Sequence, residues 1–282
     1  MTILEARNLF RTHLATLYVQ AEIDAIFKGC IAHYFNWEPV KVGLSPHQLL
    51  QAEEESILTK ALGELEKATP LQYVLGETQF CGLSIRVASG VLIPRPETET
   101  LVDWVVAEHS ESPKTVIDLC TGSGCIALAL AKRRPNWQLA GLDISDRALE
   151  IARENSRLNA LKVDWQQVDV LQADFSLAPC DLIVSNPPYV LPSEKKQMHA
   201  NVLQHEPDGA LFVPEDDPLL FYSAILRSAK KALTPNGSLY FEINPLCLDT
   251  LLAAGKKLGF THAEVKKDIF EKNRFVKFSC TL

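Results

Sequence analysis

The sequence predicts an α/β protein with a doubly wound, mostly parallel sheet, preceded by a small helical domain. Strand and helix patterns alternate from residue 114 to the end of the chain, which is typical of parallel strands covered by helices on both faces. Before residue 70, apolar residues recur at helical spacing instead. We therefore expect a helical bundle at residues 1–75, a β-hairpin linker at 76–93 and the α/β domain at 94–282.

The helical part contains three amphipathic patterns, at residues 3–17, 23–34 and 50–65. They carry no chemical motif, so we expect a packed bundle without catalytic groups. Residues 80–94 then alternate between apolar and polar positions, which predicts two short strands joined by a turn.

The α/β part divides into strands and helices by its periodicity. Strands are expected at 114–120, 137–143, 162–170, 181–186, 237–243, 263–269 and 274–280. Helices are expected at 125–134, 145–160, 217–233 and 245–258, with Ser145 as an N-cap and Pro235-Asn236-Gly237 as a stop signal. The last two strands follow each other directly, so we expect them to form an antiparallel hairpin at one edge.

Composition excludes several classes of protein. The chain has 282 residues, of which 47% are hydrophobic and 22% charged, as in ordinary globular proteins. Its apolar stretches are too short for a membrane span, and its N-terminus lacks the layout of a signal peptide, which predicts a cytoplasmic protein. The seven cysteines include no C-x-x-C pair, and the histidines are dispersed, so we expect free thiols and no metal site.

The net charge of −7 bears on the choice of partner. Proteins that grip a nucleic-acid backbone normally carry a basic surplus or a basic stripe. Here the basic clusters are short and have acidic neighbours, so we expect no extended nucleic-acid binding.

A glycine loop follows the first strand of the α/β domain, in the segment DLCTGSGCIALALA (118–131). Gly122 and Gly124 allow a tight turn and a close approach to a ligand at a helix N-terminus. Asp143 ends the next strand, 19 residues after Gly124, where a carboxylate can bind ribose hydroxyls. Together they predict a nucleoside cofactor, although the glycines could merely close the turn and Asp143 could merely cap a helix.

Asp118 favours S-adenosylmethionine over a dinucleotide as that cofactor. A carboxylate at the start of the loop suits the sulfonium and ammonium charges of S-adenosylmethionine, and it would repel a pyrophosphate. In addition, no pair of residues suited to hydride transfer follows the later strands.

The segment SNPPYV (185–190) ends the fourth strand with two prolines, which cannot extend a β-ladder. Asn186 Oδ1 and the carbonyl of Pro187 can accept the two hydrogens of a planar NH2 group, while Tyr189 offers a flat face to pack on it. The carboxyl ends of parallel strands share one crevice, so we expect these residues beside the glycine loop and Asp143. The alternative is a rigid turn that only terminates the strand.

The whole chain resembles the HemK/PrmC-type protein-(glutamine-N5) methyltransferases. The resemblance is carried by PLQYVLG (70–76), LIPRPETE (92–99), DLCTGSGCIALALA, GLD (141–143) and SNPPYV, together with the helical N-terminal part. It implies a seven-stranded class I methyltransferase fold, S-adenosyl-L-methionine as cofactor, and methylation of the glutamine in the GGQ loop of class I peptide chain release factors. It further implies a monomer whose bundle docks the release factor.

The resemblance also implies roles for individual residues. The methionine part of the cofactor would be wrapped by Cys120, Thr121, Gly122, Ser123 and Gly124. Asp143 would bind the ribose, Asp169 and Val170 would border the adenine, and Asn186 would contact the cofactor as well. The catalytic motif that holds the glutamine amide would be Asn186, Pro187, Pro188 and Tyr189. The entrance to the active site would be bordered by Arg95, Pro96, Glu97, Thr98 and Glu99, which could otherwise form a structural loop between the domains.

Two positions depart from the family pattern. Val170 stands where an aromatic residue is common, which implies weaker stacking on the adenine. Asn244, in Glu242-Ile243-Asn244, stands where the family usually has glycine, which leaves the local backbone turn open.

Four other functions remain alternatives. One is a methyltransferase acting on exocyclic amines of nucleic acid. A second is a glutamine methyltransferase acting on a ribosomal protein, which is related to the release-factor enzymes. Another is an NAD-dependent oxidoreductase, which would explain the glycine loop but leave Asn186–Tyr189 unused. The last is a cofactor-binding protein without catalysis, in which the bundle serves as an interaction module.

Overall fold

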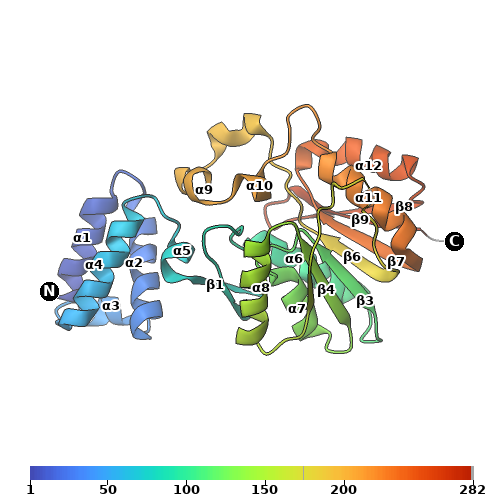
Figure 1. The fold of residues 1–282 in the computed structure, drawn as a ribbon. Coiled ribbons are helices and arrows are strands. Elements are labelled where there is room, and N and C mark those ends of the chain that lie inside the picture. The colour runs from blue at the N-terminus through green and yellow to red at the C-terminus, as the bar shows by residue number, and fades with distance from the viewer. Residues whose placement is uncertain (174, 281–282) are drawn as a thin grey trace. The chain divides into compact units, whose positions relative to one another are not determined.

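The computed structural model describes residues 1–173 and 175–280, and the chain divides into two compact units (Figure 1). Unit 1 contains Met1–Gly76 together with His199–His205. Unit 2 contains Glu77–Met198 and continues from Glu206. Each unit has a hydrophobic core of its own.

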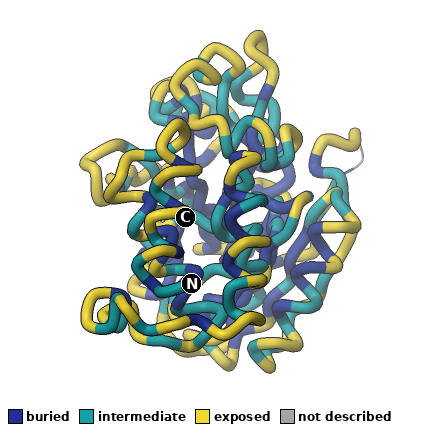
Figure 2. Tube along the Cα trace, turned by 90° about the vertical axis from the view of Figure 1, so that its left-hand side faces the viewer, coloured by how far each residue is buried: buried dark blue, intermediate teal, exposed yellow. Residues whose placement is uncertain are grey.

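Unit 1 is helical. Its helices are α1 (Ile3–Leu14), α2 (Gln20–Phe35), α3 (Lys41–Leu44), α4 (Ala52–Leu65), α5 (Leu71–Leu75) and α9 (Ala200–His205). A capping box of Thr2 and Glu5 starts α1. Buried and exposed positions alternate along these helices at helical spacing (Figure 2). The buried side includes Phe10 and Phe27, whose rings meet edge to face at 5.1 Å.

The last helix of unit 1 comes from a distant part of the sequence. Sequence analysis predicts no helix near residue 200, yet α9 packs with the bundle. The His205 ring lies 2.9 Å from the carbonyl oxygen of Lys67, through Nε2. A single turn of polar residues gives no periodic signal, which explains why the pattern does not reveal it.

Unit 2 begins with a hairpin, β1 (Glu77–Phe80) and β2 (Leu83–Arg86). The strands expected within residues 80–94 are therefore placed too late, because residues 87–95 form no strand. Gly90 at φ +104° and the following prolines interrupt regular pairing there. The hairpin is held by Asn155, which bonds both the N–H and the carbonyl of Arg86.

The main sheet has seven strands in the order β5-β4-β3-β6-β7-β9-β8. Its strands are β3 (Thr115–Leu119), β4 (Gln138–Asp143), β5 (Asp164–Gln167), β6 (Cys180–Ser185), β7 (Leu233–Glu242), β8 (His262–Lys267) and β9 (Asn273–Ser279). All pairs from β5 to β7 are parallel, and β9 is antiparallel to both β7 and β8. The predicted mostly parallel, doubly wound sheet is confirmed, as is the terminal antiparallel hairpin.

Helices cover both faces of this sheet (Figure 1). The longer ones are α6 (Pro96–Glu108), α7 (Cys125–Arg133), α8 (Asp146–Leu158), α11 (Leu220–Ala232) and α12 (Leu248–Lys257), and the short ones are η1 (Pro192–Gln197), α10 (Asp208–Leu211) and η2 (Pro245–Cys247). Ile117 and Leu119 pack with α11 and α12, whereas Tyr240 meets Trp104 of α6. Successive residues of a strand point to opposite faces of the sheet, so the helices on both faces pack against the same strands.

Several predicted boundaries need correction. Helix α6 is absent from the prediction, although Pro96 at its first position and Glu97 and Glu99 in its first turn are helix-start signals. The stop signal Pro235-Asn236-Gly237 lies inside β7, where the pairing with β6 shifts register between Cys180 and Leu182. The predicted N-cap is confirmed, because Ser145 Oγ accepts a hydrogen bond from the N–H of Ala148.

The seven cysteines are unpaired thiols. Within residues 1–173 and 175–280, no cluster of three or more His, Cys, Asp or Glu side chains could hold a metal ion. The same residues include no helix that is both long enough and apolar enough to cross a membrane.

Candidate active site

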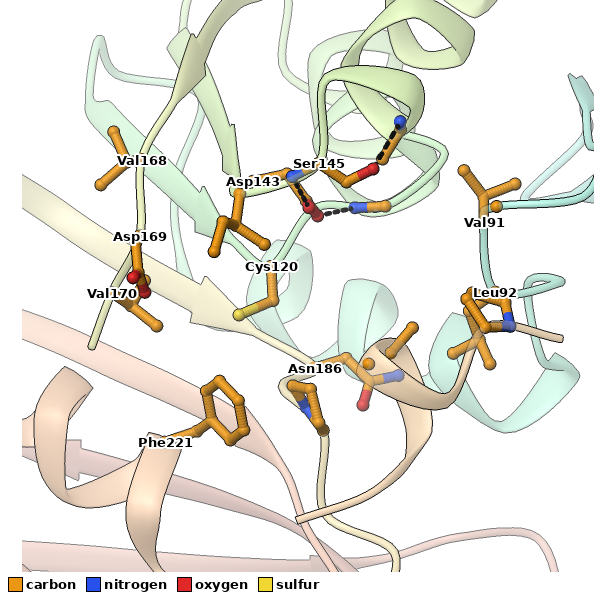
Figure 3. Close-up of a pocket in the computed structure, with 18 of the residues that line it drawn as sticks. Val91, Leu92, Cys120, Asp143, Ser145, Val168, Asp169, Val170, Asn186 and Phe221 are labelled. Carbon is orange, nitrogen blue, oxygen red and sulfur yellow. Dashed lines mark hydrogen bonds between the residues drawn. The ribbon is translucent and has the colours of Figure 1, made fainter. Parts of the chain in front are cut away.

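A cavity of about 370 Å³ opens at the carboxyl ends of β3, β4 and β6 (Figure 3). The structure brings there seven of the predicted site residues from the three strand ends and the loop after β5. They are Cys120, Gly122, Asp143, Asp169, Val170, Asn186 and Pro188. The expected meeting of glycine loop, acid and proline motif is thus found.

The two glycines of the loop differ in what they face. Gly122 has φ +55°, and a Cβ built there would meet nothing within 4 Å, because the residue borders the cavity. Gly124 has φ +81° and starts α7, and a Cβ there would lie 2.6 Å from the Trp165 ring. Gly122 is therefore needed for space and backbone shape at the cavity, and Gly124 for close packing inside the protein.

Asp143 holds the glycine loop against the next strand. Its Oδ2 accepts a hydrogen bond from the N–H of Gly122 at 2.8 Å, and its Oδ1 accepts one from the N–H of Ser145 at 2.9 Å (Figure 3). Burial raises the pKa of Asp143, and these backbone N–H groups oppose that rise. Each carboxylate oxygen keeps a further lone pair for a ligand, so Asp143 can order the loop and bind hydroxyls at once.

Asp118 lies beneath the loop and does not line the cavity. Its Oδ2 accepts hydrogen bonds from Thr121 Oγ1 at 2.5 Å and from the N–H of Ala127 at 3.2 Å. Its Oδ1 is buried without a hydrogen-bond partner in the described part of the chain. Complete burial raises the pKa of Asp118 to about 7. Thr121, Ser123 and Gly124 likewise lie outside the cavity wall and shape the loop from behind.

The other side of the cavity is an apolar slot with one carboxylate. Val168, Val170, Leu171 and Phe221 supply apolar surface, and the Phe221 ring lies across from Val170 in Figure 3. Asp169 stands among them, and its Oδ1 accepts the N–H of Leu171 at 2.8 Å. An apolar slot beside two carboxylates fits an adenosine group that carries ribose hydroxyls and a positively charged tail.

Asn186 presents its side-chain amide at the cavity (Figure 3). That amide makes no hydrogen bond to protein groups among residues 1–173 and 175–280, so its oxygen and its NH2 group are available to a ligand. Pro187 is buried and does not line the cavity.

Tyr189 also lies outside the cavity wall, and its hydroxyl donates to Glu242 Oε1 at 2.9 Å. Burial and the neighbouring Glu242 carboxylate raise the pKa of Tyr189 well above its ordinary value. The neutral phenol is therefore held as a hydrogen-bond donor.

The segment predicted to border the entrance is the start of α6. Arg95 forms an ion pair with Glu206 at 2.7 Å, and Glu206 also accepts the N–H of Ile93. Thr98 is buried and donates to Glu242 Oε2 at 2.6 Å. Pro96 is the first residue of the helix, and Glu99 accepts a hydrogen bond from the N–H of Cys81. The segment is therefore an ordered part of unit 2. None of residues 95–99 lines the cavity, and their role at an entrance stays a prediction.

The sequence patterns do not reveal the roles of four residues at the site. Glu206 and Glu242 are buried carboxylates bonded to the predicted residues, yet each lies far away in the sequence. Phe221 contributes a wall without any motif of its own, and Leu92, the first residue of LIPRPETE, lines the cavity although the prediction assigns only Arg95–Glu99 to its entrance. Each of the two acids is a single charged residue within an otherwise apolar or turn-forming segment, and that contrast is the only signal of its burial. The signal becomes informative only when the residue that bonds the carboxylate is known.

Comparison with known proteins gives consistent matches. Residues 5–76 match the family model of the PrmC N-terminal domain, and residues 96–211 match that of the methyltransferase small domain. A release factor glutamine methyltransferase from Flavobacterium psychrophilum is 40% identical, over 98% of this chain and 99% of that protein. One from Bacteroides thetaiotaomicron is 39% identical, over 94% of this chain and 96% of that protein.

Solved structures match in fold. A methyltransferase from Pyrococcus furiosus superposes with a TM-score of 0.53 at 16% identity, covering 71% of this chain and 90% of that one. The fold is thus that of S-adenosylmethionine-dependent methyltransferases of class I, with an added N-terminal helical domain.

Proposed function

This chain belongs to the release factor glutamine methyltransferase family, and we propose that it methylates the side-chain amide nitrogen of the GGQ-loop glutamine in class I peptide chain release factors. The observation that carries the proposal is that Gly122, Asp143 and Asn186 line the same cavity. A nucleoside site and an unengaged amide group side by side are what methyl transfer to a planar nitrogen requires.

S-adenosyl-L-methionine is the cofactor, and when bound it supplies an electrophilic methyl group on its sulfonium. The apolar slot with Val170 takes the adenine, while Asp143 accepts hydrogen bonds from the ribose. The glycine loop from Cys120 to Gly124 surrounds the methionine part. Asp118 supports this loop from beneath through Thr121 and Ala127.

The substrate amide is held by Asn186 and the proline motif. Asn186 Oδ1 accepts one amide hydrogen and the carbonyl of Pro187 accepts the other, so the nitrogen lone pair faces the cofactor side. The two prolines contribute fixed φ angles and no competing N–H. The amide nitrogen held in this way would be aligned for in-line attack on the methyl group that the bound cofactor would supply, with the thioether as leaving group and the extra proton passing to solvent. Orientation of this kind lowers barriers by several kcal/mol, roughly, without a strong base.

The remaining parts of the chain serve recognition of the substrate. We assign the helical bundle at 1–75 to docking of the release factor and residues 76–93 to a linker. Arg95–Glu99 border the entrance through which the GGQ loop reaches Asn186. The net negative charge is compatible with a protein loop as substrate, because such a substrate needs no basic stripe. All the residues that line the cavity come from one chain, which supports a monomer. We assign its activity to the cytoplasm, where the translation machinery acts.

The test is transfer of label from methyl-labelled S-adenosyl-L-methionine to a purified class I release factor. We expect labelling of the intact release factor and none of a variant whose GGQ glutamine is replaced by alanine. Equal labelling of that variant, or labelling only of nucleic acid or of a ribosomal protein, would overturn the proposal. Copurification of a nicotinamide cofactor would favour the oxidoreductase alternative.

A further inference from the structure

The end of strand β7 places two polar side chains in the interior of unit 2. Glu242 and Asn244 are 2% and 3% exposed, whereas Ile243 between them belongs to the hydrophobic core. Alternation along an extended chain puts Glu242 and Asn244 on the same side, away from that core. Both reach residues of the loop that follows β6.

Asn244 uses both hydrogens of its side-chain amide. Nδ2 donates to the carbonyl oxygen of Tyr189 at 3.1 Å and to Glu194 Oε2 at 2.7 Å. Its Oδ1 accepts the N–H of Leu246 at 3.0 Å, which caps helix η2. Its own φ is −73°, so the backbone here does not require glycine.

Tyr189 is consequently held at three points. Its hydroxyl donates to Glu242, its N–H donates to the carbonyl of Leu211 at 3.2 Å, and its carbonyl accepts from Asn244. The two residues before it are prolines without N–H groups, so Tyr189 is the first residue after Asn186 whose backbone can donate a hydrogen bond. The orientation of the proline motif therefore depends on how Tyr189 is fixed.

We propose that Asn244 is a positioning residue that fixes the Tyr189 carbonyl and thereby aims Asn186 and the Pro187 carbonyl at the substrate amide. This inference rests on the proposed function of the motif. Asn244 also couples the motif to Glu194 of η1, so it holds the loop after β6 at Tyr189 and again five residues later. Loss of the Nδ2 donor would leave the Tyr189 carbonyl oxygen without this partner, and that peptide plane would then be held from its other side, where the N–H of Val190 donates to the carbonyl of Leu211 at 2.8 Å.

The informative variant is Asn244→Asp. It preserves the size of the side chain and the oxygen that accepts from Leu246, but it removes the donor to Tyr189 and Glu194. We expect kcat for release factor methylation to fall about 10- to 100-fold, with the Kd for S-adenosyl-L-methionine within about twofold of wild type. Asn136→Asp, at an exposed position of unit 2, is the matched control and should leave both constants unchanged.

A double variant separates positioning from stability. In Asn244→Asp with Glu194→Gln, the glutamine can donate to the new carboxylate and remove the repulsion between two acids, but the Tyr189 carbonyl still has no donor. We expect the melting temperature to recover while kcat stays low. Recovery of both together would reduce Asn244 to a structural role and overturn the inference, as would unchanged kcat in Asn244→Asp.

The same assay keeps the two proposals apart. Wild-type protein that binds S-adenosyl-L-methionine but does not methylate the release factor would overturn the proposed function, and this inference with it. Active wild type with an equally active Asn244→Asp variant would overturn the inference alone.

Discussion

Two loops at the same edge of the sheet are built in opposite ways. The loop after β3 uses positive φ angles at Cys120, Gly122 and Gly124, and backbone N–H groups of the loop and of the following helix donate to Asp143 and Asp118. The loop after β6 begins with Asn186 and two prolines, which remove N–H groups and fix φ. The first is held through its backbone donors, and the second by side chains of β7 that reach Tyr189.

The difference corresponds to what each loop is proposed to hold. Backbone approach and carboxylates suit a charged cofactor that must sit against the main chain. Rigid carbonyls and a free side-chain amide suit a neutral amide group whose hydrogens must be oriented. Binding and turnover should therefore respond separately to changes in the two loops.

Removal of the Asn186 side chain should give the largest effect. Asn186→Ala deletes the unengaged amide at the cavity, so kcat should fall about 10²- to 10³-fold, as for other preorganised hydrogen-bonding groups. The Kd for S-adenosyl-L-methionine should change little, and calorimetric titration alongside the methylation assay measures both. A loss of cofactor binding of similar size would make Asn186 chiefly a cofactor residue.

The two glycines should separate cofactor binding from stability. Gly124→Ala places a methyl group against Trp165 at φ +81°, so the free energy of unfolding should fall by roughly 2–4 kcal/mol. Gly122→Ala keeps part of that backbone strain but directs the methyl group into the cavity, so cofactor affinity should drop about tenfold or more. Adding Trp165→Phe should restore stability to the Gly124 variant only, as measured by denaturant unfolding.

Loss of the Tyr189 hydroxyl should have a smaller effect on turnover. Tyr189→Phe removes one of the two hydroxyl donors to Glu242, so kcat should fall about tenfold. Thr98→Val removes the other donor without touching the proline loop, so it should cost similar stability but less turnover. Equal losses of kcat in the two variants would point to the charge state of Glu242 instead of the placement of Tyr189.

The smallest effect concerns pH. Burial raises the folded-state pKa of Asp118 from 3.8 to about 7, so its contribution to stability is complete below pH 3.8 and declines as the pH rises towards 7. Between pH 6 and pH 8 the free energy of unfolding should fall by about 1 kcal/mol from this group. Asp118→Asn keeps an oxygen for Thr121 and should flatten that part of the profile. An unchanged profile would contradict a raised pKa.

The sequence predicts the parts of the molecule that repeat or lie close together in the chain. The alternation after residue 114 predicts the parallel sheet, and the short sequence distance between the glycine loop and Asp143 predicts that Gly122 and Asp143 meet at one cavity. Helix α6 is not predicted because its first turn coincides with the segment Arg95–Glu99 that is interpreted as an entrance loop. The bonds from Glu242 and Asn244 to Tyr189 join residues more than fifty positions apart, and no local pattern contains such information.

The division of unit 1 has a consequence for how the protein is made. Its helices up to α5 are complete when Gly76 has been synthesised, but α9 follows only after strands β3 to β6. During synthesis on the ribosome, the contact between the Lys67 carbonyl and the His205 ring can form only after residue 205 has been added. A fragment ending at Gly76 would lack that last helix permanently, so completion of unit 1 depends on prior synthesis of the intervening part of unit 2.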